Sequence, residues 1–235
     1  IEFRKKKLAA LKAAGIDPYP SSTKRDHTNQ EALDNFDALA ETKKEITVVG
    51  RIRSLRTQGK ITFAHIEDGT TKIQLFFKAD NLAEKFALLE NFDLGDFIEA
   101  TGVLFKTKTE EKTLDVLDFK MLAKSLRPLP SEHYGLSDIE IRLRQRYLDL
   151  LMNPEAREMF VKKSKFWAAT QKYLVDQGFL QVEAPVLESV PGGAEAEPFI
   201  THHNALDRDF YLRISLELPL KKLIVGGYEK VFEIG

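Results

Sequence analysis

The sequence predicts a protein of mixed α and β class, in which a small five-stranded β-barrel precedes a second domain that begins with helices. Three observations support this prediction. A chain of 235 residues with 43% hydrophobic and 30% charged side chains is long enough for two cores. Stretches of alternating hydrophobic and polar residues lie between residues 45 and 125, and helical patterns follow them. A segment containing proline and glycine separates the two regions.

Residues 1–44 are predicted to contain a basic helix and a connecting helix. The opening stretch, IEFRKKKLAALKAAG, contains strong helix formers and a cluster of basic residues. Gly15, Pro18 and Pro20 end this helix. The basic residues are either solvated or in contact with phosphate groups, and the sequence leaves both alternatives open.

Residues 45–125 show the alternation of β-strands in five segments. These are EITVVGRIRSLRTQ, KITFAHIEDG, TKIQLFFKAD, GDFIEATGVLFKTK and KTLDVLDFKMLA. A helical pattern, LAEKFALLENF, lies between the third segment and the fourth. Three strands, a helix and two strands is the order of an OB barrel, a fold that binds oligonucleotides, although other small barrels also fit five short strands.

Three residue types that bind single-stranded RNA lie on the predicted barrel strands. Phe63 lies on the second strand and Gln74 on the third, and the first strand contains Arg51, Arg53 and Arg56. An aromatic ring stacks on a base, an amide pairs with a base edge, and arginine holds phosphate. Phe63 also fits an ordinary core position, so each residue is weak evidence when it is taken alone.

Residues 126–152 are predicted to form a linker, LRPLPSEHYG, and a helix that begins at a Ser137 cap. Residues 153–235 begin with a second helix, which has Asn153 as its cap and ends at Gly178. Short strands and loops follow, with Glu217 on a strand. The final strand, which begins at Val231, is expected to be an unpaired edge.

Composition excludes several classes of protein. The absence of cysteine excludes disulfide frameworks and thiolate metal sites. The 35 basic and 36 acidic residues create no overall attraction to nucleic acid, and no apolar run is long enough to span a membrane. His202 and His203 point to opposite faces of an extended segment without a third ligand nearby, so we expect no metal site.

Long segments of the second domain resemble the class II lysyl-tRNA synthetases of the bacterial type. They are KSLRPLPSEHYGLSDIEIRLRQRYLDLLMNPEARE and PGGAEAEPFITHHNALDRDFYLRISLELPLKKLIVGGYEKVFEIG, and the resemblance extends from GIDPYP to Gly235. The segment QGFLQVEAPVLE, which contains Phe179 and Pro185, resembles the motif 1 dimer interface of that family. The resemblance implies an OB anticodon-binding domain followed by the beginning of an antiparallel-sheet catalytic domain.

The resemblance also implies roles for individual residues. Phe63 and Gln74 match the aromatic ring and the amide that recognise the middle uridine of the anticodon, and Glu111 matches a third anticodon contact. Gly193 matches the glycine whose carbonyl accepts from the α-ammonium group of lysine, and Glu217 matches the carboxylate that pairs with this group. A carboxylate suits that role because a buried ammonium group needs a partner.

Three residues depart from the family pattern. Leu216 precedes Glu217 where proline is usual, Ala184 precedes Pro185 where threonine is usual, and Glu197 stands where arginine is common. The last difference reverses a charge beside the expected lysine pocket.

The implied function is ligation of lysine to tRNA(Lys) through a lysyl-adenylate, by a cytoplasmic homodimer that uses ATP and Mg²⁺. In the family the residues that hold ATP and Mg²⁺ lie beyond the position of Gly235, so we expect residues 1–235 to bind tRNA without forming adenylate. No catalytic side chain is expected within them. Two alternatives remain, an aspartate or asparagine synthetase and a stand-alone OB module that binds RNA and has a synthetase-like tail.

Overall fold

The computed structural model describes residues 1–130 and 136–234, and the chain forms two compact units. The first unit is Ile1–Gly135 and the second is Leu136–Gly235. Residues 131–135 of the predicted linker lie outside the described residues. Each unit is therefore described by itself.

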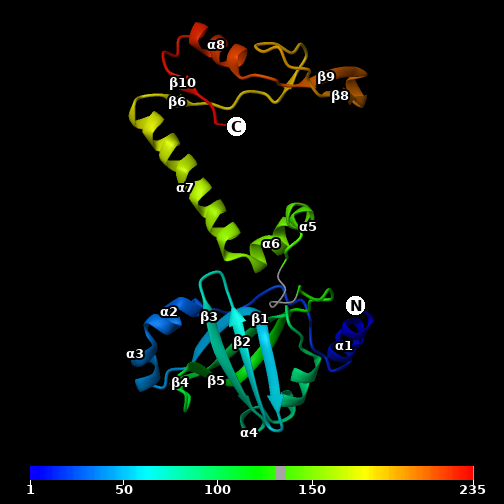
Figure 1. Cartoon of the computed structure of the whole chain (residues 1–235), viewed down its shortest axis with the longest axis vertical. Helices are drawn as coiled ribbons and strands as arrows, with labels where there is room; N and C mark the ends of the chain where they lie inside the picture. Colours follow the sequence, from blue (N-terminus) through cyan, green and yellow to red (C-terminus); the bar gives the residue numbers. More distant parts are fainter. Residues whose placement is uncertain (131–135, 235) are drawn as a thin grey trace. The chain divides into compact units, whose positions relative to one another are not determined.

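Five strands of the first unit close into a barrel in the order β1-β2-β3-β5-β4, as Figure 1 shows. Strands β3 and β5 pair in parallel, and the other neighbours pair in antiparallel fashion. The predicted five-stranded OB barrel is confirmed. The strands are β1 (Ile46–Gln58), β2 (Ile61–Glu67), β3 (Lys72–Lys78), β4 (Phe97–Lys106) and β5 (Lys112–Ala123).

Alternating side chains from all five strands fill the barrel interior. The pattern is clearest at one residue of each strand, which is almost completely buried and less exposed than the residues next to it. These residues are Val48, Ile66, Leu75, Leu104 and Val116. The predicted helix between β3 and β4 is present as the short α4 (Ala79–Leu82) and the 3₁₀ helix η1 (Ala83–Asn91). These segments add buried leucines to the same core.

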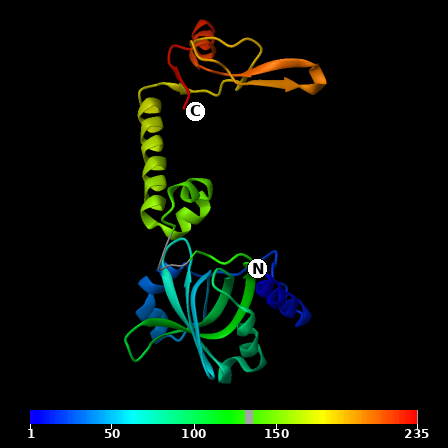
Figure 2. The same ribbon diagram turned by 45° about the vertical axis from the view of Figure 1, so that its right-hand side comes forward.

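Three amino-terminal helices pack on the outside of the barrel, as Figures 1 and 2 show. They are α1 (Glu2–Ala13), α2 (Asn29–Asp34) and α3 (Phe36–Glu41). Leu11 from α1, Ala32 from α2 and Phe36 from α3 are buried in the barrel core. Thr28 caps the α2 helix in a capping box, in which the side chains of Thr28 and Glu31 each accept a hydrogen bond from the other residue's backbone N–H group.

The basic residues of α1 fall into two groups, of which one contacts the barrel and the other is exposed. The Arg4 guanidinium donates to the carbonyl oxygens of Leu94 at 3.0 Å and Ser125 at 3.1 Å. Lys7 forms an ion pair with Asp93 at 2.8 Å. These two side chains hold α1 against the barrel, whereas Lys5, Lys6 and Lys12 are exposed.

A buried ion cluster lies where α1 meets the barrel. Lys124, at the end of β5, donates to Asp93 at 2.5 Å and to Asp96 at 2.8 Å. Asp96 also accepts from the backbone N–H groups of Asp93 and Ser125. Burial raises the pKa of Asp96 above its usual value despite these bonds. Burial also opposes ionisation of Asp93, but the ammonium groups of Lys124 and Lys7 hold its pKa below its usual value.

The second unit begins with three helices, and the predicted Ser137 cap is wrong. The cap is Asp138, whose carboxylate accepts from the N–H of Ile141 at 3.0 Å. Gln145, with φ −112° and ψ 54°, interrupts the predicted single helix. The helices are α5 (Ile139–Arg144), α6 (Arg146–Met152) and α7 (Pro154–Asp176).

The interruption between α5 and α6 is held by the buried Asp149. Its carboxylate accepts from Arg142 at 2.7 Å, from Arg146 at 2.6 Å and from Asn153 at 2.6 Å. The hydrogen bond from the side-chain amide of Asn153 and those from the two guanidinium groups hold the pKa of Asp149 below its usual value. Asn153 precedes α7 as expected, but its side chain bonds to Asp149 and does not cap the helix. Gly178 follows α7 with φ +82°, a value that favours glycine.

Short strands and one further helix complete the second unit. Strand β10 pairs in parallel with β6, so the expected absence of a partner for the final strand is wrong. Strand β9 lies between β7 and β8 in an antiparallel sheet. The elements are β6 (Leu180–Gln181), β7 (Leu187–Glu188), β8 (Ile200–His203), η2 (Asn204–Leu206), β9 (Arg208–Leu212), α8 (Glu217–Val225) and β10 (Val231–Phe232).

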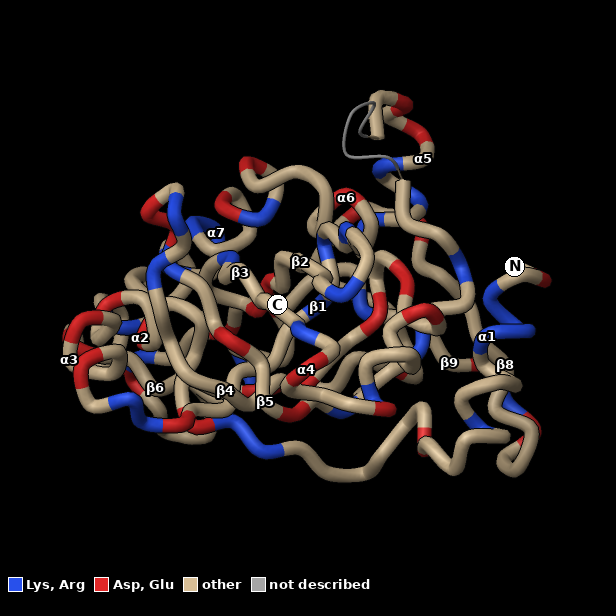
Figure 3. The backbone as a smooth tube through the Cα atoms, turned by 90° about the horizontal axis from the view of Figure 1, so that it is seen from below, with Lys and Arg blue, Asp and Glu red and all other residues tan. Residues whose placement is uncertain are grey.

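Charge and hydropathy are distributed without long segregated runs. Figure 3 shows basic and acidic residues interspersed along the backbone. Within the described residues, none of the helices combines the length and the apolar character needed to cross a membrane.

Candidate nucleic-acid interface

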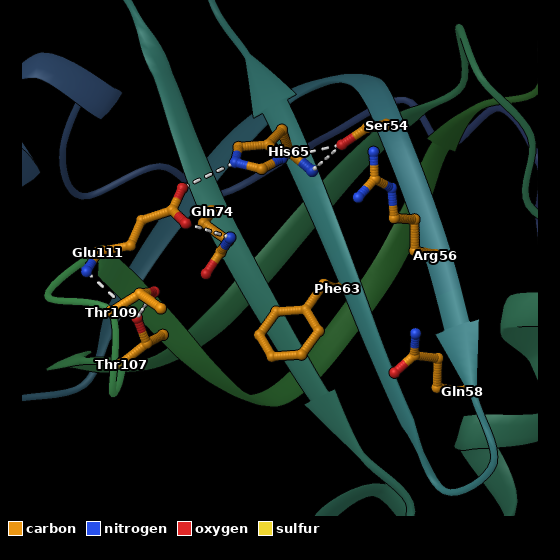
Figure 4. A pocket seen from close by; sticks show the side chains of 9 residues that line it. All are labelled: Ser54, Arg56, Gln58, Phe63, His65, Gln74, Thr107, Thr109 and Glu111. Carbon is orange, nitrogen blue, oxygen red and sulfur yellow. Dashed lines mark hydrogen bonds and ion pairs between the residues drawn. The ribbon is translucent and has the colours of Figure 1, made fainter.

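An open pocket of about 330 Å³ lies on the outer face of strands β1, β2 and β3. This volume is at the lower end of the range of about 300–1,000 Å³ that is typical of ligand sites. Figure 4 shows its lining side chains projecting from these strands and from the β4–β5 connection. They are Ser54, Arg56, Gln58, Phe63, His65, Gln74, Thr107, Thr109 and Glu111.

A bulge in β1 decides which side chains of that strand reach the pocket. The pairing of β1 with β2 shifts between Ile52 and Ser54, so that Ser54 lies opposite His65 and Arg56 lies opposite Phe63. One extra residue in a strand reverses the faces of all residues after it. The bulge therefore places Ser54, Arg56 and Gln58 on the pocket face.

Aromatic rings form a row across the same outer face. Phe63 stacks on Phe76 with ring centres 4.6 Å apart and an interplanar angle of 23°. Phe105 extends the row, with its ring centre 5.9 Å from that of Phe76. Phe63 lines the pocket and is half-buried, so it is not the core residue of the alternative interpretation. A supported ring of this kind is suited to stacking on a base.

A hydrogen-bonded network holds the polar side of the pocket, as Figure 4 shows in part. Glu111 accepts from Gln74 Nε2 at 2.7 Å, and its other oxygen lies 2.9 Å from His65 Nε2. Gln74 Oε1 accepts from the Thr113 hydroxyl at 2.7 Å. Ser54 Oγ lies 2.9 Å from His65 Nδ1. The amide of Gln74 is therefore fixed from both ends.

Three of the four predicted barrel residues come together, and Arg53 does not join them. Phe63, Gln74 and Glu111 line the pocket, whereas Arg53 pairs with Glu67 at 3.2 Å and its side chain is only 8% exposed. Arg56 is the arginine of the pocket. Sequence reasoning did not identify His65, although it lies two residues after Phe63 and alternation places both on one face.

In the second unit, the structure brings Gly193 and Glu217 together. A Cβ atom added to Gly193 would lie 3.1 Å from Ser215 Oγ and 3.3 Å from the Glu217 Cβ. Gly193 also has φ +89°, which larger residues rarely adopt. Glu217 is the first residue of α8, so its predicted position on a strand is wrong. Its carboxylate is about half exposed and pairs with Lys221 one helical turn later.

An ion pair that sequence reasoning did not identify lies beside this region. Arg213 donates to Glu233 at 2.6 Å, and both side chains are largely buried. Arg213 also donates to the carbonyl of Ala184, while Glu233 accepts from the N–H of Ala184. The segment before Pro185 is therefore held through its backbone, which does not depend on the identity of the side chain at position 184.

The two histidines of β8 have partners within the unit. His202 lies 2.8 Å from an Asp209 oxygen through Nδ1, and His203 Nδ1 accepts from the N–H of Leu206. In the part of the chain that the structure describes, no cluster of three or more histidine or carboxylate side chains is arranged to hold a metal ion.

Comparison with known families assigns both units. Residues 46–128 match the family described as OB-fold nucleic acid binding domain. Residues 138–235 match the family described as tRNA synthetases class II (D, K and N). The second unit is therefore similar to this family over nearly its whole length. The OB barrel and this synthetase unit therefore confirm the predicted combination of folds.

Individual relatives are similar to the chain along its whole length. It is 49% identical over 235 residues to a lysine-tRNA ligase of Pelotomaculum thermopropionicum, covering 100% of the chain and 46% of the relative. A lysine-tRNA ligase of Halalkalibacterium halodurans is 48% identical, covering 100% of the chain and 48% of the relative. One of Bacillus subtilis is 44% identical with the same coverage of 100% and 48%. The chain thus spans about half the length of these curated relatives.

The remaining predicted residues of the synthetase unit lie at its surface or near it. Phe179 is half-buried and has the Lys230 ammonium group 5.6 Å from its ring centre, whereas Pro185 is exposed. Glu197 is exposed and Leu216 is half-buried. The α7 helix exposes large apolar side chains, among them Phe160, Phe166, Trp167 and Tyr173.

Proposed function

We propose that this chain is part of a lysine-tRNA ligase and that its barrel recognises the anticodon of tRNA(Lys). The observation that supports this most directly is the pocket on the OB barrel, which combines an aromatic ring, a fixed amide and an arginine. Similarity to lysine-tRNA ligases over the whole chain supports the choice of amino acid. An aspartate or asparagine enzyme, or a stand-alone RNA-binding module, is less consistent with that similarity.

The pocket offers each group that an unstacked base requires. Phe63 provides a ring face for stacking, and Arg56 provides a cation for the neighbouring phosphate. A side-chain amide has two N–H groups and two acceptor lone pairs. Gln74 uses one of each within the protein, so one donor and one acceptor remain for a base edge. We propose that this edge belongs to the middle uridine of the anticodon.

We also propose that Gly193 and Glu217 contact the α-ammonium group of lysine. Their proximity supports the proposal, since a Cβ added to Gly193 would lie 3.3 Å from the Glu217 Cβ. Lys221 already places an ammonium group on Glu217, which indicates that the carboxylate is accessible to a cation. The exposed apolar side chains of α7 support a homodimer interface that includes Phe179 and Pro185.

In the proposed reaction, the lysine carboxylate attacks the α-phosphorus of ATP to give lysyl-adenylate and pyrophosphate. A terminal ribose hydroxyl of the tRNA then attacks the lysyl carbonyl and AMP leaves. ATP and Mg²⁺ would supply the leaving group and charge neutralisation. We propose that the residues holding them lie outside positions 1–235. A protein of these residues should then show no ATP–pyrophosphate exchange above background, and lysine-dependent exchange would contradict this.

The anticodon proposal predicts base discrimination by the chain. A lysine anticodon stem-loop should bind about tenfold more tightly than the same loop with its middle uridine changed to cytidine, which corresponds to about 1.4 kcal/mol. Fluorescence anisotropy at one fixed salt concentration measures both affinities, since phosphate contacts make affinity depend on salt. Gln74→Leu should reduce this preference. Equal binding of the two loops by the unsubstituted chain would contradict base recognition at this site.

A further inference from the structure

We propose that His65 is a positioning residue that fixes the Gln74 amide through Glu111 and thereby sets the preference of the pocket between uridine and cytidine. This inference rests on the proposed function, because it concerns the same pocket. It is based on the hydrogen-bonded series Ser54, His65, Glu111, Gln74 and Thr113.

The bonds around His65 determine where its ring proton lies. An ionised Glu111 only accepts, so the His65 nitrogen that lies 2.9 Å from it, Nε2, must have a hydrogen. In the neutral ring Nδ1 is then an acceptor, and the Ser54 hydroxyl donates to it at 2.9 Å. Ser54 Oγ in turn accepts from the backbone N–H of His65 at 3.2 Å. Each atom in this part of the series has a partner of the correct kind.

Glu111 is held at a single position by two side chains and by its own loop. His65 bonds to one carboxylate oxygen and Gln74 to the other. The Glu111 backbone N–H donates to Thr107 Oγ1, and its carbonyl accepts from the N–H of Thr107 and from the Thr113 hydroxyl. Without His65, the Glu111 side chain would retain one of its two side-chain bonds and could rotate toward solvent, since it is 45% exposed.

The position of Glu111 determines which end of the Gln74 amide faces it. If the amide rotated by half a turn, its oxygen would face a carboxylate oxygen and neither atom could donate. The single hydrogen of the Thr113 hydroxyl has two acceptors within reach, Gln74 Oε1 and the Glu111 carbonyl. If the amide rotated, the hydroxyl could donate to the Glu111 carbonyl and accept from Gln74 Nε2, so Thr113 does not by itself fix the amide. Glu111 is therefore the group that excludes the rotated amide.

A fixed amide distinguishes the two pyrimidines. Uracil presents an acceptor at position 4 and a donor at position 3, whereas cytosine presents a donor and an acceptor at the same places. An amide held in one orientation matches only one of these two patterns for a base stacked in a given pose. An amide free to rotate matches both. Loss of His65 should therefore affect discrimination more than total affinity.

Three substitutions of the full chain test this role. His65→Leu removes both ring nitrogens, while His65→Gln retains an N–H donor for Glu111. Thr101→Val is the control for the loss of a side-chain hydrogen bond elsewhere on the barrel, because it removes the 2.8 Å contact with Thr47 and Thr101 does not line the pocket. The readout is the affinity ratio between the uridine and cytidine stem-loops at fixed salt, with a thermal melt of each variant.

His65→Leu should lower the uridine-to-cytidine ratio about threefold to tenfold, the size expected for one net hydrogen bond. Most of this change should come from tighter binding of the cytidine loop, while the affinity for the uridine loop falls by less than about twofold. His65→Gln and Thr101→Val should keep ratios within about twofold of the unsubstituted chain. If His65→Leu has the same ratio of uridine-loop to cytidine-loop affinity as the unsubstituted chain, the role of His65 is overturned, while anticodon recognition is unaffected. If the unsubstituted chain does not discriminate, both proposals fail.

A second variant keeps the test decisive if His65→Leu does not fold. Ser54→Ala removes the group that donates to His65 Nδ1 but leaves Glu111 and Gln74 in place. It should lower the ratio about threefold, which is beyond the range allowed to the controls, because the ring loses its orienting bond and keeps the bond to Glu111. A folded Ser54→Ala chain with an unchanged ratio would count against the series acting as a unit.

Discussion

Replacement of Lys124 with methionine should destabilise the barrel unit by about 3–5 kcal/mol, the usual cost of removing one partner from a buried ion pair. Lys124 is fully buried and bonds to both Asp93 and Asp96. Methionine has a similar length and fills the same space, so the loss is mainly electrostatic. Two carboxylates would then remain close together, and Asp96 is itself fully buried.

The loss is measured by unfolding the full chain in urea and monitoring the barrel through hydrogen exchange of its backbone amides. Lys85→Met is the matched control, because Lys85 pairs with Asp118 at the surface, where an ion pair contributes about 0–1 kcal/mol. Adding Asp96→Asn to Lys124→Met should recover part of the loss by removing one unpaired charge. Similar small effects of Lys124→Met and Lys85→Met would show that the buried cluster does not stabilise the barrel.

Phe63→Ala should weaken binding of the lysine anticodon stem-loop by about 1–3 kcal/mol, or roughly 5-fold to 150-fold. This is the contribution of one base stacked on an aromatic ring. The substitution also removes the ring that stacks on Phe76, so part of the loss can come from a less ordered pocket. Phe63→Trp separates these effects, because it retains an aromatic face.

Phe97→Ala is the control for the loss of an aromatic ring from this barrel. Phe97 is half-buried, lies under the Arg51 guanidinium and does not line the pocket. Its removal should change stem-loop affinity by less than about twofold, within the range of surface substitutions distant from a site. Equal losses in Phe63→Ala and Phe97→Ala would argue for a general loss of structure and against stacking at Phe63.

Much of the barrel is predictable from local sequence because its strands alternate regularly and are separated by clear turns. The segment at Ile61–Glu67 shows this pattern plainly, with buried residues at every second position. The same alternation places Phe63 and His65 on one face. Gln74 joins them because the β2–β3 register pairs it with His65.

The pocket could not be completed from alternation, since the β1 bulge interrupts it. Regular alternation along β1 places Arg53 with Arg51, whereas the shift after Ile52 brings Ser54 and Arg56 to the pocket face. Nothing in the local composition marks the bulge. The network around Gln74 was also hidden, because Glu111 belongs to a loop distant in sequence.

In the second unit, the errors arise where tertiary contacts override local propensity. The predicted helix divides at Gln145, where the buried Asp149 gathers side chains from both halves. Glu217 follows a strand-like sequence but begins a helix, with its N–H bonded to Ser215 Oγ. The proximity of Gly193 to Glu217 depends on how two separate loops pack, which no local pattern indicates.

The contacts of Arg4 have a consequence for synthesis of the chain. Its guanidinium bonds to the carbonyl of Ser125, which lies 121 residues later in the sequence. On the ribosome, the docking site of helix α1 is therefore incomplete until the last barrel strand has emerged. At about 5–20 residues per second, it waits on the order of ten seconds with Leu11 exposed. We therefore expect chaperones to bind this helix in the nascent chain and not in the folded protein, where Leu11 is buried.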